Sequence, residues 1–294
     1  MKDFLFKSPT KVKFGAGTSF QLYEIFEEMG VKKPFFVTGK HVGKTDEFAK
    51  IIASLEEKGY SVQLFTDTQP DPPIDVCDAA AQVLKDSGCD VCVAVGGGSV
   101  IDTAKAMCML ITNEGSVKEY LFGGSKTVEN PSLPLIAVPT TAGSGSEVSA
   151  ASVITDEEND IKLSVSHEYL MPKFAIIDPL QQIHMPAFIT ATTGMDALTH
   201  AIESYVSLNA NPFSDAYGEM AIRLIGENIR AAVHDPLNLE AREKMAVAST
   251  LAGTAFVNGG LGAVHGISQA MGGVAHVAHG TANSMMLPFV IEKN

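Results

Sequence analysis

Four side chains in the second half of the sequence have the chemistry to bind a divalent metal. Asp196 and His200 are four residues apart in the segment 194–204, so both lie on one face if that segment is helical. His265 and His279 follow, and each precedes a glycine, which leaves room for a ligand. One carboxylate and three imidazoles suit a metal of intermediate softness, such as iron(II) or zinc. The spacing therefore indicates metal-assisted chemistry.

A glycine-rich segment in the first half, residues 95–105, is the strongest motif there. It follows an apolar run and opens a helical pattern, so its glycines allow close backbone approach and its helix start favours an anion such as pyrophosphate. The segment matches neither GxGxxG nor the P-loop. A nucleotide site and a simple strand-to-helix turn both remain open for this motif.

A second polar loop, residues 139–147, follows the next apolar run. Its hydroxyls and backbone amides can bind phosphate or ribose, whereas the alternative is a polar surface turn. Two such loops after adjacent strands favour a shared ligand over either loop acting alone.

Two of the four cysteines, Cys89 and Cys92, form a CxxC pattern. Cys92 falls inside an expected buried strand, and no second CxxC completes a four-thiolate zinc site. We interpret these residues as reduced, buried thiols.

The elements that must position these side chains change in character along the chain. The first part alternates strands, expected at 34–38, 61–65, 90–95 and 134–138, with helices at 44–58, 74–87 and 100–111. Such alternation predicts a parallel sheet covered by helices, with ligands at the carboxyl ends of the strands.

The second part is expected to be helical. Helical patterns cover 190–207, 214–233 and 239–257, and a broken one starts at 261. Prolines between the parts favour a boundary near 179–186, which gives an α/β domain at 1–182 and an all-α domain at 183–294. The apolar residues at 283–294 carry no recognisable terminal cap, so the helical domain is expected to be incomplete.

Composition excludes several other classes of protein. The chain has 294 residues, a formal net charge of −13 and 46% hydrophobic residues, which indicates a globular protein. The negative charge disfavours a nucleic-acid or anionic-membrane binder. Neither a membrane-spanning run nor a signal peptide is recognisable, so a cytoplasmic location is the expectation.

The sequence resembles the iron-containing (group III) alcohol dehydrogenase family. The resemblance rests on residues 96–99 with Asp102, on 139–141, on 195–203 and on 279–283, in the family's order. It implies a dinucleotide-binding α/β domain and an all-α metal-binding domain, an architecture shared with dehydroquinate synthase. The active site would lie between the two domains and act on a small alcohol or aldehyde.

The resemblance also implies roles for individual residues. Asp196, His200, His265 and His279 would be the metal ligands, with iron(II) favoured over zinc. The three histidines would act in catalysis through the metal. The cofactor NAD(P) would be bound by residues of the α/β part: Gly39, Lys40, Asp71, Gly97, Gly98, Ser99, Asp102, Thr140, Thr141, Ser149 and Lys162.

Three features depart from the family pattern. Gln269 stands where a second histidine often follows His265, so the usual proton relay lacks a titratable group, and His276 is a weaker substitute. Asp71 stands where asparagine is common. The chain ends where the family usually continues, so we expect either a fragment or a short member.

The residues after the first expected strand bear on whether the cofactor is NAD or NADP. NAD-preferring relatives tend to place an aspartate where Gly39 stands, because a carboxylate binds the ribose 2′-hydroxyl and repels a 2′-phosphate. Gly39 leaves space and Lys40 adds positive charge, which favours NADP(H). Alternatively, Gly39 only forms a turn.

Two rival functions remain open. One is a metal- and NAD-dependent lyase of the dehydroquinate synthase type, although the helical half is poor in the lysine and arginine that its acidic substrate needs. The other is a truncated cofactor-binding fragment without turnover, whose exposed apolar surface would favour self-association. A homo-oligomer is also possible for the intact enzyme.

Overall fold

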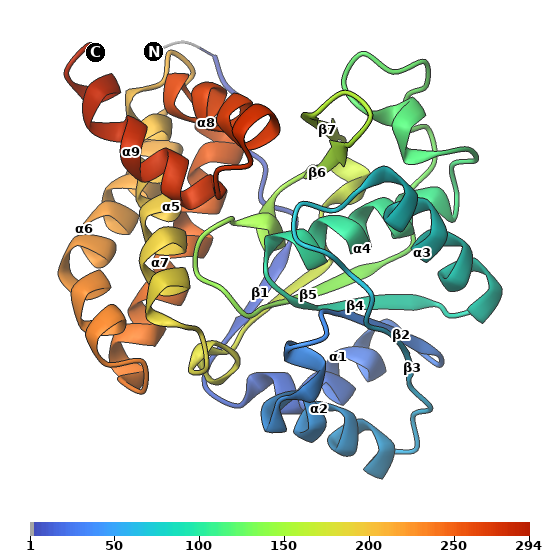
Figure 1. The fold of residues 1–294 in the computed structure, drawn as a ribbon. Helices are drawn as coiled ribbons and strands as arrows, with labels where there is room; N and C mark the ends of the chain where they lie inside the picture. The colour runs from blue at the N-terminus through green and yellow to red at the C-terminus, as the bar shows by residue number, and fades with distance from the viewer. Residues whose placement is uncertain (1–2) are drawn as a thin grey trace.

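The computed structural model describes residues 3–294. Six parallel strands form the central sheet in the order β1-β8-β5-β4-β2-β3 (Figure 1). Their bounds are β1 Lys11–Phe14, β2 Pro34–Thr38, β3 Gln63–Phe65, β4 Val91–Gly96, β5 Leu135–Pro139 and β8 Phe174–Ile177. Between β5 and β8, a separate antiparallel hairpin is formed by β6 Ala151–Asp156 and β7 Ile161–Ser166.

Helices cover both faces of the sheet. On one face lie α1 (Leu22–Met29) and α2 (Asp46–Glu57), and on the other lie α3 (Ile74–Ser87) and α4 (Gly98–Leu110) (Figure 1). Every residue of β2, β4 and β5 is buried. Near-continuous apolar runs are typical of parallel strands that are covered on both faces, and this explains why the three strands are readable in the sequence.

The direction in which strands are added to the sheet reverses next to β4. From β2 the chain moves outward to β3, and then returns to β4 on the other side of β2 before continuing to β5 and β8. At such a switch point the connections at the carboxyl ends of neighbouring strands diverge and leave a crevice for a ligand. The turns after β2 and β4, at Gly39 and Gly97, lie at this crevice.

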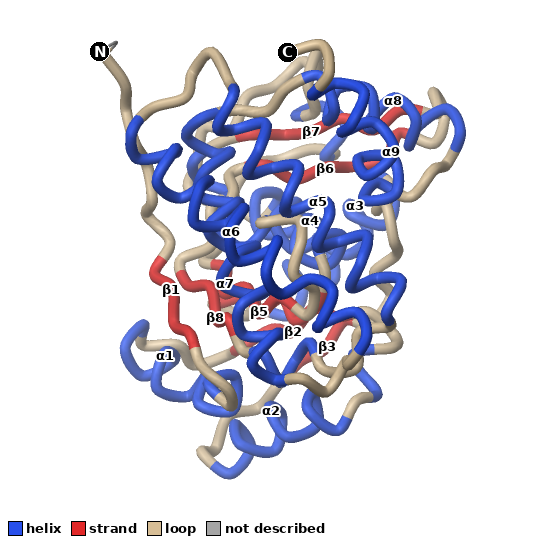
Figure 2. Tube along the Cα trace, turned by 90° about the vertical axis from the view of Figure 1, so that its left-hand side faces the viewer, coloured by secondary structure: helices blue, strands red, loops and turns tan. Residues whose placement is uncertain are grey.

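The rest of the chain is helical and packs beside the sheet (Figure 2). It consists of α5 Ala187–Val206, α6 Pro212–His234, α7 Leu239–Gly259, α8 Ala263–Ala275 and α9 His279–Ile291. Asn211 caps α6 with a reciprocal bond to Ser214, and Pro212 occupies the first turn, so the start of α6 is locally encoded. In residues 3–294 no single helix could span a bilayer, although the bent pair α7–α8 meets the length and hydropathy criteria together.

The expected α/β-plus-helical fold is confirmed, but four strands and one helix were not anticipated: β1, β6, β7, β8 and α1. The reason is clear for β1 and β7, whose residues are mostly exposed or half-buried and therefore lack an apolar run. Several expected ends are also shifted, since β3 starts at Gln63 rather than Ser61. The change from strands to helices falls between β8 and α5, and the division into domains at 182/183 stays a prediction.

Short 3₁₀ turns complete the connections that matter for the site. The loop after β5 contains η4 (Ser146–Val148), which packs against α4 and α7. The turn η6 (Pro179–Gln182) leads from β8 to α5, and Asp178 caps it by accepting a hydrogen bond from the backbone of Leu180.

Candidate active site

A cavity of about 900 Å³ lies between the carboxyl edge of the sheet and the helical part. It is lined by the turns after β2 and β4, by the loop after β5, and by α5, α8 and α9. All the cofactor residues expected from the sequence line it except Thr140, which is buried and donates a backbone hydrogen bond to Gly96. The two polar loops and the four metal-ligand candidates thus face one shared space.

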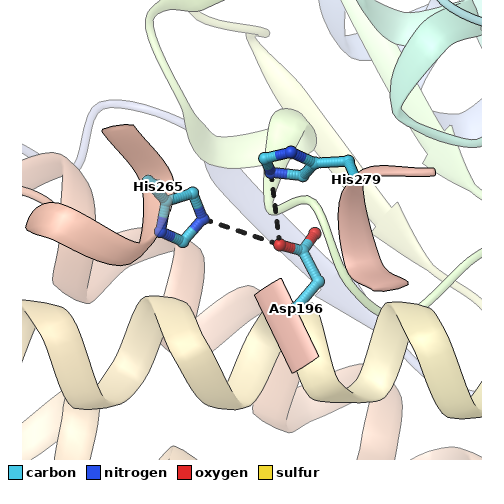
Figure 3. A group of neighbouring side chains, drawn as sticks. All are labelled: Asp196, His265 and His279. Atoms are coloured by element: carbon cyan, nitrogen blue, oxygen red, sulfur yellow. Dashed lines mark ion pairs between the residues drawn. The ribbon is translucent and has the colours of Figure 1, made fainter. Parts of the chain in front are cut away.

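Asp196, His265 and His279 form a compact cluster on the helical side of this cavity (Figure 3). Asp196 Oδ1 lies 3.6 Å from His265 Nε2 and 3.5 Å from His279 Nε2. One ligand atom from each residue lies within 4.8 Å of the others, although the residues come from α5, α8 and α9. Three convergent donors of this kind fit a divalent cation.

His200 lies directly beside the cluster, but its ligand atom is not part of that compact set. Its Nε2 is 3.8 Å from Asp196 Oδ1, and its ring stacks on that of His265 with centroids 4.4 Å apart. On its other side lies the ring of Phe256, and its Nδ1 is 3.3 Å from the carbonyl oxygen of Gly143. The spacing of four on α5 therefore brings Asp196 and His200 to one face, as expected.

Burial and charge give the members of this cluster different protonation states. Burial alone would raise the pKa of Asp196, yet the surrounding imidazoles, His200 foremost, lower it well below its usual value. Burial lowers the pKa of His200 to about 3, so its ring is neutral at pH 7. Burial also works against the charged form of His265, yet Asp196 and Glu203 raise the pKa of its ring to about 9, so at pH 7 it carries a proton that a bound metal would replace. Within residues 3–294, no lysine or arginine lies within 4.0 Å of the Asp196 carboxylate, and its close neighbours of basic type are histidines.

Glu203, which the sequence reasoning did not assign, supports His265 from behind. Its Oε2 lies 2.5 Å from His265 Nδ1, and its Oε1 accepts a 2.7 Å hydrogen bond from the backbone N–H of Val264. One carboxylate therefore caps the start of α8 and also orients the His265 ring so that Nε2 faces the cluster. Gly262 permits this approach, because a Cβ there would lie 2.8 Å from Glu203 Oε1.

Asn283 is a second residue that supports the cluster and that the sequence did not reveal. Its side chain is fully buried, and its Nδ2 donates a 2.7 Å hydrogen bond to Asp196 Oδ1 while lying 3.2 Å from His279 Nε2 and 3.3 Å from His265 Nε2. Its Oδ1 has no hydrogen-bond partner among the described residues. The Asn283 Nδ2 thus lies within hydrogen-bond distance of one atom of each member of the cluster, and its buried Oδ1 can still accept a hydrogen bond from an additional group. The only sequence signal was its place in the 279–283 motif.

The opposite side of the cavity is the start of α4. Gly97 precedes this helix, and a Cβ at Gly98 would lie only 2.9 Å from Ser144 Oγ of the loop after β5, so the glycine lets the two loops approach closely. Ser99 accepts a hydrogen bond from the backbone of Asp71 at 3.2 Å. Free backbone N–H groups at a helix start favour a phosphate there.

Two lysines on the cavity wall are each paired with an aspartate. Lys162 Nζ lies 2.6 Å from Asp71 Oδ1, and Lys40 Nζ lies 3.1 Å from Asp67 Oδ1. Lys162 is nearly buried, whereas the Lys40–Asp67 pair is exposed. Both lysines line the cavity, but neither ammonium is free of a counter-ion.

The two residues considered for proton transfer differ in position. Gln269 lines the cavity one turn of α8 beyond His265. His276 ends α8 in the left-handed conformation with φ 52°, is exposed, and is not among the residues that line the cavity. The structure therefore brings Gln269 to the site and leaves His276 outside it.

The glycines after two of the histidines serve different purposes. At Gly266 an added Cβ would meet nothing within 4 Å, whereas at Gly280 it would collide with the backbone of Thr192 on α5. Gly280 therefore allows the close crossing of α9 and α5 that carries His279 toward Asp196. Helix packing, more than room for a ligand, accounts for this glycine.

Comparison with known proteins covers nearly the whole chain. Residues 9–179 match the family described as iron-containing alcohol dehydrogenase, and residues 190–294 match the C-terminal family of Fe-containing alcohol dehydrogenases. Long-chain-alcohol dehydrogenase 1 of Geobacillus thermodenitrificans is 41% identical over 278 residues, covering 94% of this chain and 70% of that protein.

Solved structures agree with this match. A 1,3-propanediol oxidoreductase superposes with a TM-score of 0.94 at 40% identity, covering 99% of this chain and 76% of that one. Sulfoacetaldehyde reductase from Bifidobacterium kashiwanohense in complex with NAD+ also gives 0.94, at 33% identity, covering 100% of this chain and 77% of that one.

Proposed function

Because this chain belongs to the iron-containing alcohol dehydrogenase family, we propose that it transfers hydride reversibly between a primary alcohol or diol and NAD(P) with the help of a divalent metal. One observation carries the proposal: the Asp196–His265–His279 cluster and the glycine turn at the start of α4 line the same cavity. A hydride donor and acceptor must lie close together, and the shared cavity provides for that.

The metal is proposed to be held by Asp196, His200, His265 and His279, with iron(II) favoured over zinc. One carboxylate and three imidazoles accept either ion, and the family name favours iron. When bound, a divalent metal lowers the pKa of an alcohol oxygen and polarises an aldehyde carbonyl. Glu203 and Asn283 are proposed to hold the His265 ring and the Asp196 carboxylate in place for it.

The dinucleotide is proposed to lie with its pyrophosphate at Gly97, Gly98 and Ser99 and its adenosine end near Gly39. The solved relative that holds NAD+ supports a dinucleotide in this fold. A Cβ at Gly39 would meet only Thr68 Oγ1 at 3.5 Å, so there is space at the end of β2. We propose NADP(H) as the preferred form, although a 2′-phosphate must compete with Asp67 for Lys40.

A small uncharged substrate fits the remaining space better than an acidic one. The lysines of the cavity wall, Lys40 and Lys162, are both paired with aspartates, so an anionic substrate would have to displace a carboxylate. This supports the alcohol dehydrogenase over a lyase of the dehydroquinate synthase type, whose substrate is acidic. The 1,3-propanediol oxidoreductase relative supports a diol or primary alcohol.

Proton transfer in this chain cannot use a histidine at position 269. Gln269 can orient a water or a substrate hydroxyl by hydrogen bonding, but its amide does not titrate. We propose that the proton leaves through water or a cofactor hydroxyl beside Gln269.

The test uses anaerobically purified protein with its metal content measured. Iron- or zinc-loaded protein is expected to reduce propanal or 3-hydroxypropanal with NADPH faster than with NADH. His200→Ala is expected to lose metal and turnover while still binding the dinucleotide. Full activity in metal-free His200→Ala protein would contradict the proposal.

A further inference from the structure

A lysine that does not line the cavity lies one layer behind its wall. Lys105 of α4 is fully buried, and its ammonium is hydrogen-bonded by three groups. It donates to Ser146 Oγ and Ser149 Oγ at 3.0 Å each, and to the carbonyl oxygen of Ala151 at 2.7 Å. An ammonium has three N–H donors, so this environment satisfies all of them. A buried charge of this kind is retained only where its partners compensate for the lost hydration.

Two carboxylates face the same ammonium. Asp102, also on α4, has its Oδ1 3.9 Å from Lys105 Nζ and accepts a 2.5 Å hydrogen bond from Ser146 Oγ. Glu147 on η4 is buried nearby and accepts a 2.8 Å hydrogen bond from Thr250 of α7. These two carboxylates are the titratable groups that shift the pKa of Lys105. The neighbouring strand β6 contributes the backbone carbonyl of Ala151, which does not titrate.

The partners of Lys105 form part of the cavity wall. Asp102, Ser146 and Ser149 all line the cavity, although Lys105 itself does not. The two hydroxyls differ in one respect. Ser146 donates its hydrogen to Asp102, whereas Ser149 accepts from Lys105 and, among residues 3–294, has no acceptor for its own hydrogen. The Ser149 hydroxyl is therefore left to donate to a ligand, with a cation behind its oxygen.

We propose that Lys105 is a positioning residue of the dinucleotide site, which orients the Ser149 hydroxyl toward the cofactor phosphates and fixes α4 against the segment 146–151. The inference rests on the proposed dinucleotide binding. Lys105 acts through Ser146 and Ser149, since its Nζ is shielded from the cavity by these side chains. Its charge favours an anion on the far side of the hydroxyls.

This position makes cofactor binding depend on pH in a recognisable way. Burial lowers the pKa of Lys105 from 10.5 to about 8, although Asp102 and Glu147 act to raise it. A bound diphosphate favours the protonated form, so binding above pH 8 requires proton uptake and becomes weaker as the pH rises.

The stability of the protein should respond to pH with the opposite sign. The unfolded chain keeps the Lys105 proton up to about pH 10.5, whereas the folded protein loses it near pH 8. The free energy of unfolding therefore rises between about pH 8 and pH 10.5, where the unfolded chain binds more protons. A lysine that only supported the fold would give the same rise in stability, but NADH affinity would not change with its titration and binding would take up no proton. Weaker NADH binding and proton uptake above pH 8 therefore separate a positioning role from simple structural support.

The experiment measures NADH binding by calorimetry in two buffers of different ionisation enthalpy, from about pH 7 to about pH 9.5. Wild-type protein is expected to bind more weakly above pH 8 and to take up protons there. Lys105→Met, which keeps the length of the side chain, is expected to bind NADH about 10- to 100-fold more weakly at pH 7 and without that uptake.

Arg242→Met is the matched control. Arg242 is also a fully buried cation, but it bonds to Thr190, Pro236 and Met185 away from the cavity. This variant should lower stability and leave NADH affinity unchanged.

The outcomes separate the two proposals. If wild-type protein binds no NADH or NADPH, the proposed function fails. If it binds NADH with no proton uptake and constant affinity across this range, the role of Lys105 is overturned, whether or not Lys105→Met folds. Equal NADH affinity in a folded Lys105→Met protein overturns it as well.

Discussion

At the scale of single residues, the site depends on side chains that orient the proposed metal ligands by hydrogen bonds. Glu203 is the clearest case, because one carboxylate both caps α8 and accepts from the ring of His265. Asn283 has a similar relation to Asp196. A metal-binding histidine usually donates its other ring N–H to such a partner, which fixes its tautomer.

We expect Glu203→Gln to weaken metal binding about 10- to 100-fold while the protein stays folded. The glutamine oxygen can still accept from Val264, but its amide N–H₂ then faces Nδ1–H of His265. The ring would transfer its proton to Nε2, which is the atom that must bind the metal. Competition with a chelating dye measures the effect in zinc- or cobalt-loaded protein. Glu219→Gln on the exposed face of α6 is the control, and equal affinity in both variants would refute the prediction.

The proposed preference for NADP(H) also rests on individual side chains. Asp67→Asn removes the counter-ion 3.1 Å from Lys40, so we expect the KM for NADPH to fall about two- to fivefold relative to that for NADH, as for an exposed ion pair. Gly39→Asp should shift the preference in the opposite direction. Asp71→Asn frees Lys162 of β7 instead of Lys40 and should leave the NADPH/NADH ratio unchanged. An unchanged NADPH/NADH ratio in Asp67→Asn would show that Lys40 does not set the cofactor preference.

The sequence predicts residues of this site only where the pattern is local or belongs to a motif. Asp196 and His200 follow from helical spacing, and the glycine turn at Gly97 follows from a strand that ends where a helix starts. Glu203 and Asn283 escape such reasoning, because their partners are 61 and 87 residues away and only the packing of α5, α8 and α9 brings them together.

At the scale of elements, the loop after β5 is fixed by its contact with α7. Gly145 has φ +62°, and a Cβ there would lie 2.6 Å from the Cα of Gly253. The two glycines let the loop rest directly on the helix backbone. This contact carries Ser144, Ser146 and Ser149 to the cavity, so the loop and α7 together shape the proposed phosphate site.

We expect Gly145→Ala to lower the free energy of unfolding by about 1–3 kcal/mol, from left-handed strain and from overlap with Gly253. Gly59→Ala is the matched control, because Gly59 has φ +84° and open space around its Cβ position, so it reports the strain alone. Urea unfolding of both variants gives the difference. Equal losses would show that the contact with α7 contributes nothing.

Several elements were predictable from the pattern of apolar residues, a continuous buried run in β2 and one buried face in α3, although the fully buried β8 was not. The strand expected at 34–38 matches β2, and the helix expected at 74–87 matches α3. In β1, lysines alternate with Val12 and Phe14, which are themselves half-exposed, so neither an apolar run nor a buried face marks it as a strand. Its pairing with β8 is set by the tertiary fold.

At the scale of the whole molecule, a metal would link three helices that the chain does not hold together locally. Its proposed ligands come from α5, α8 and α9, and Lys162 of β7 packs near Gly272 of α8. A cation bound in the folded state only must therefore stabilise the assembly of the helical part.

We expect the free energy of unfolding to rise by about 2.7 kcal/mol when free metal is a hundredfold above its Kd. Thermal unfolding of metal-stripped protein, with and without zinc or anaerobic iron(II), measures this. Asp196→Asn should lose most of the gain, since it removes the carboxylate at the centre of the cluster. A similar gain in that variant would place the stabilising metal elsewhere.

The pairing of β1 with β8 has a consequence for how the protein is made. β1 lies at the edge of the sheet, and its residue Lys11 is in register with Phe174 of β8, about 160 residues later in the chain. At ribosomal rates of about 5–20 residues per second, the nascent strand waits roughly 8–30 s for β8, its one neighbour in the sheet among residues 3–294. During that time Lys11 and Lys13 keep an unpaired strand charged, which discourages pairing with other nascent chains. The same lysines that leave β1 without an apolar run in the sequence thus disfavour wrong strand pairing during synthesis.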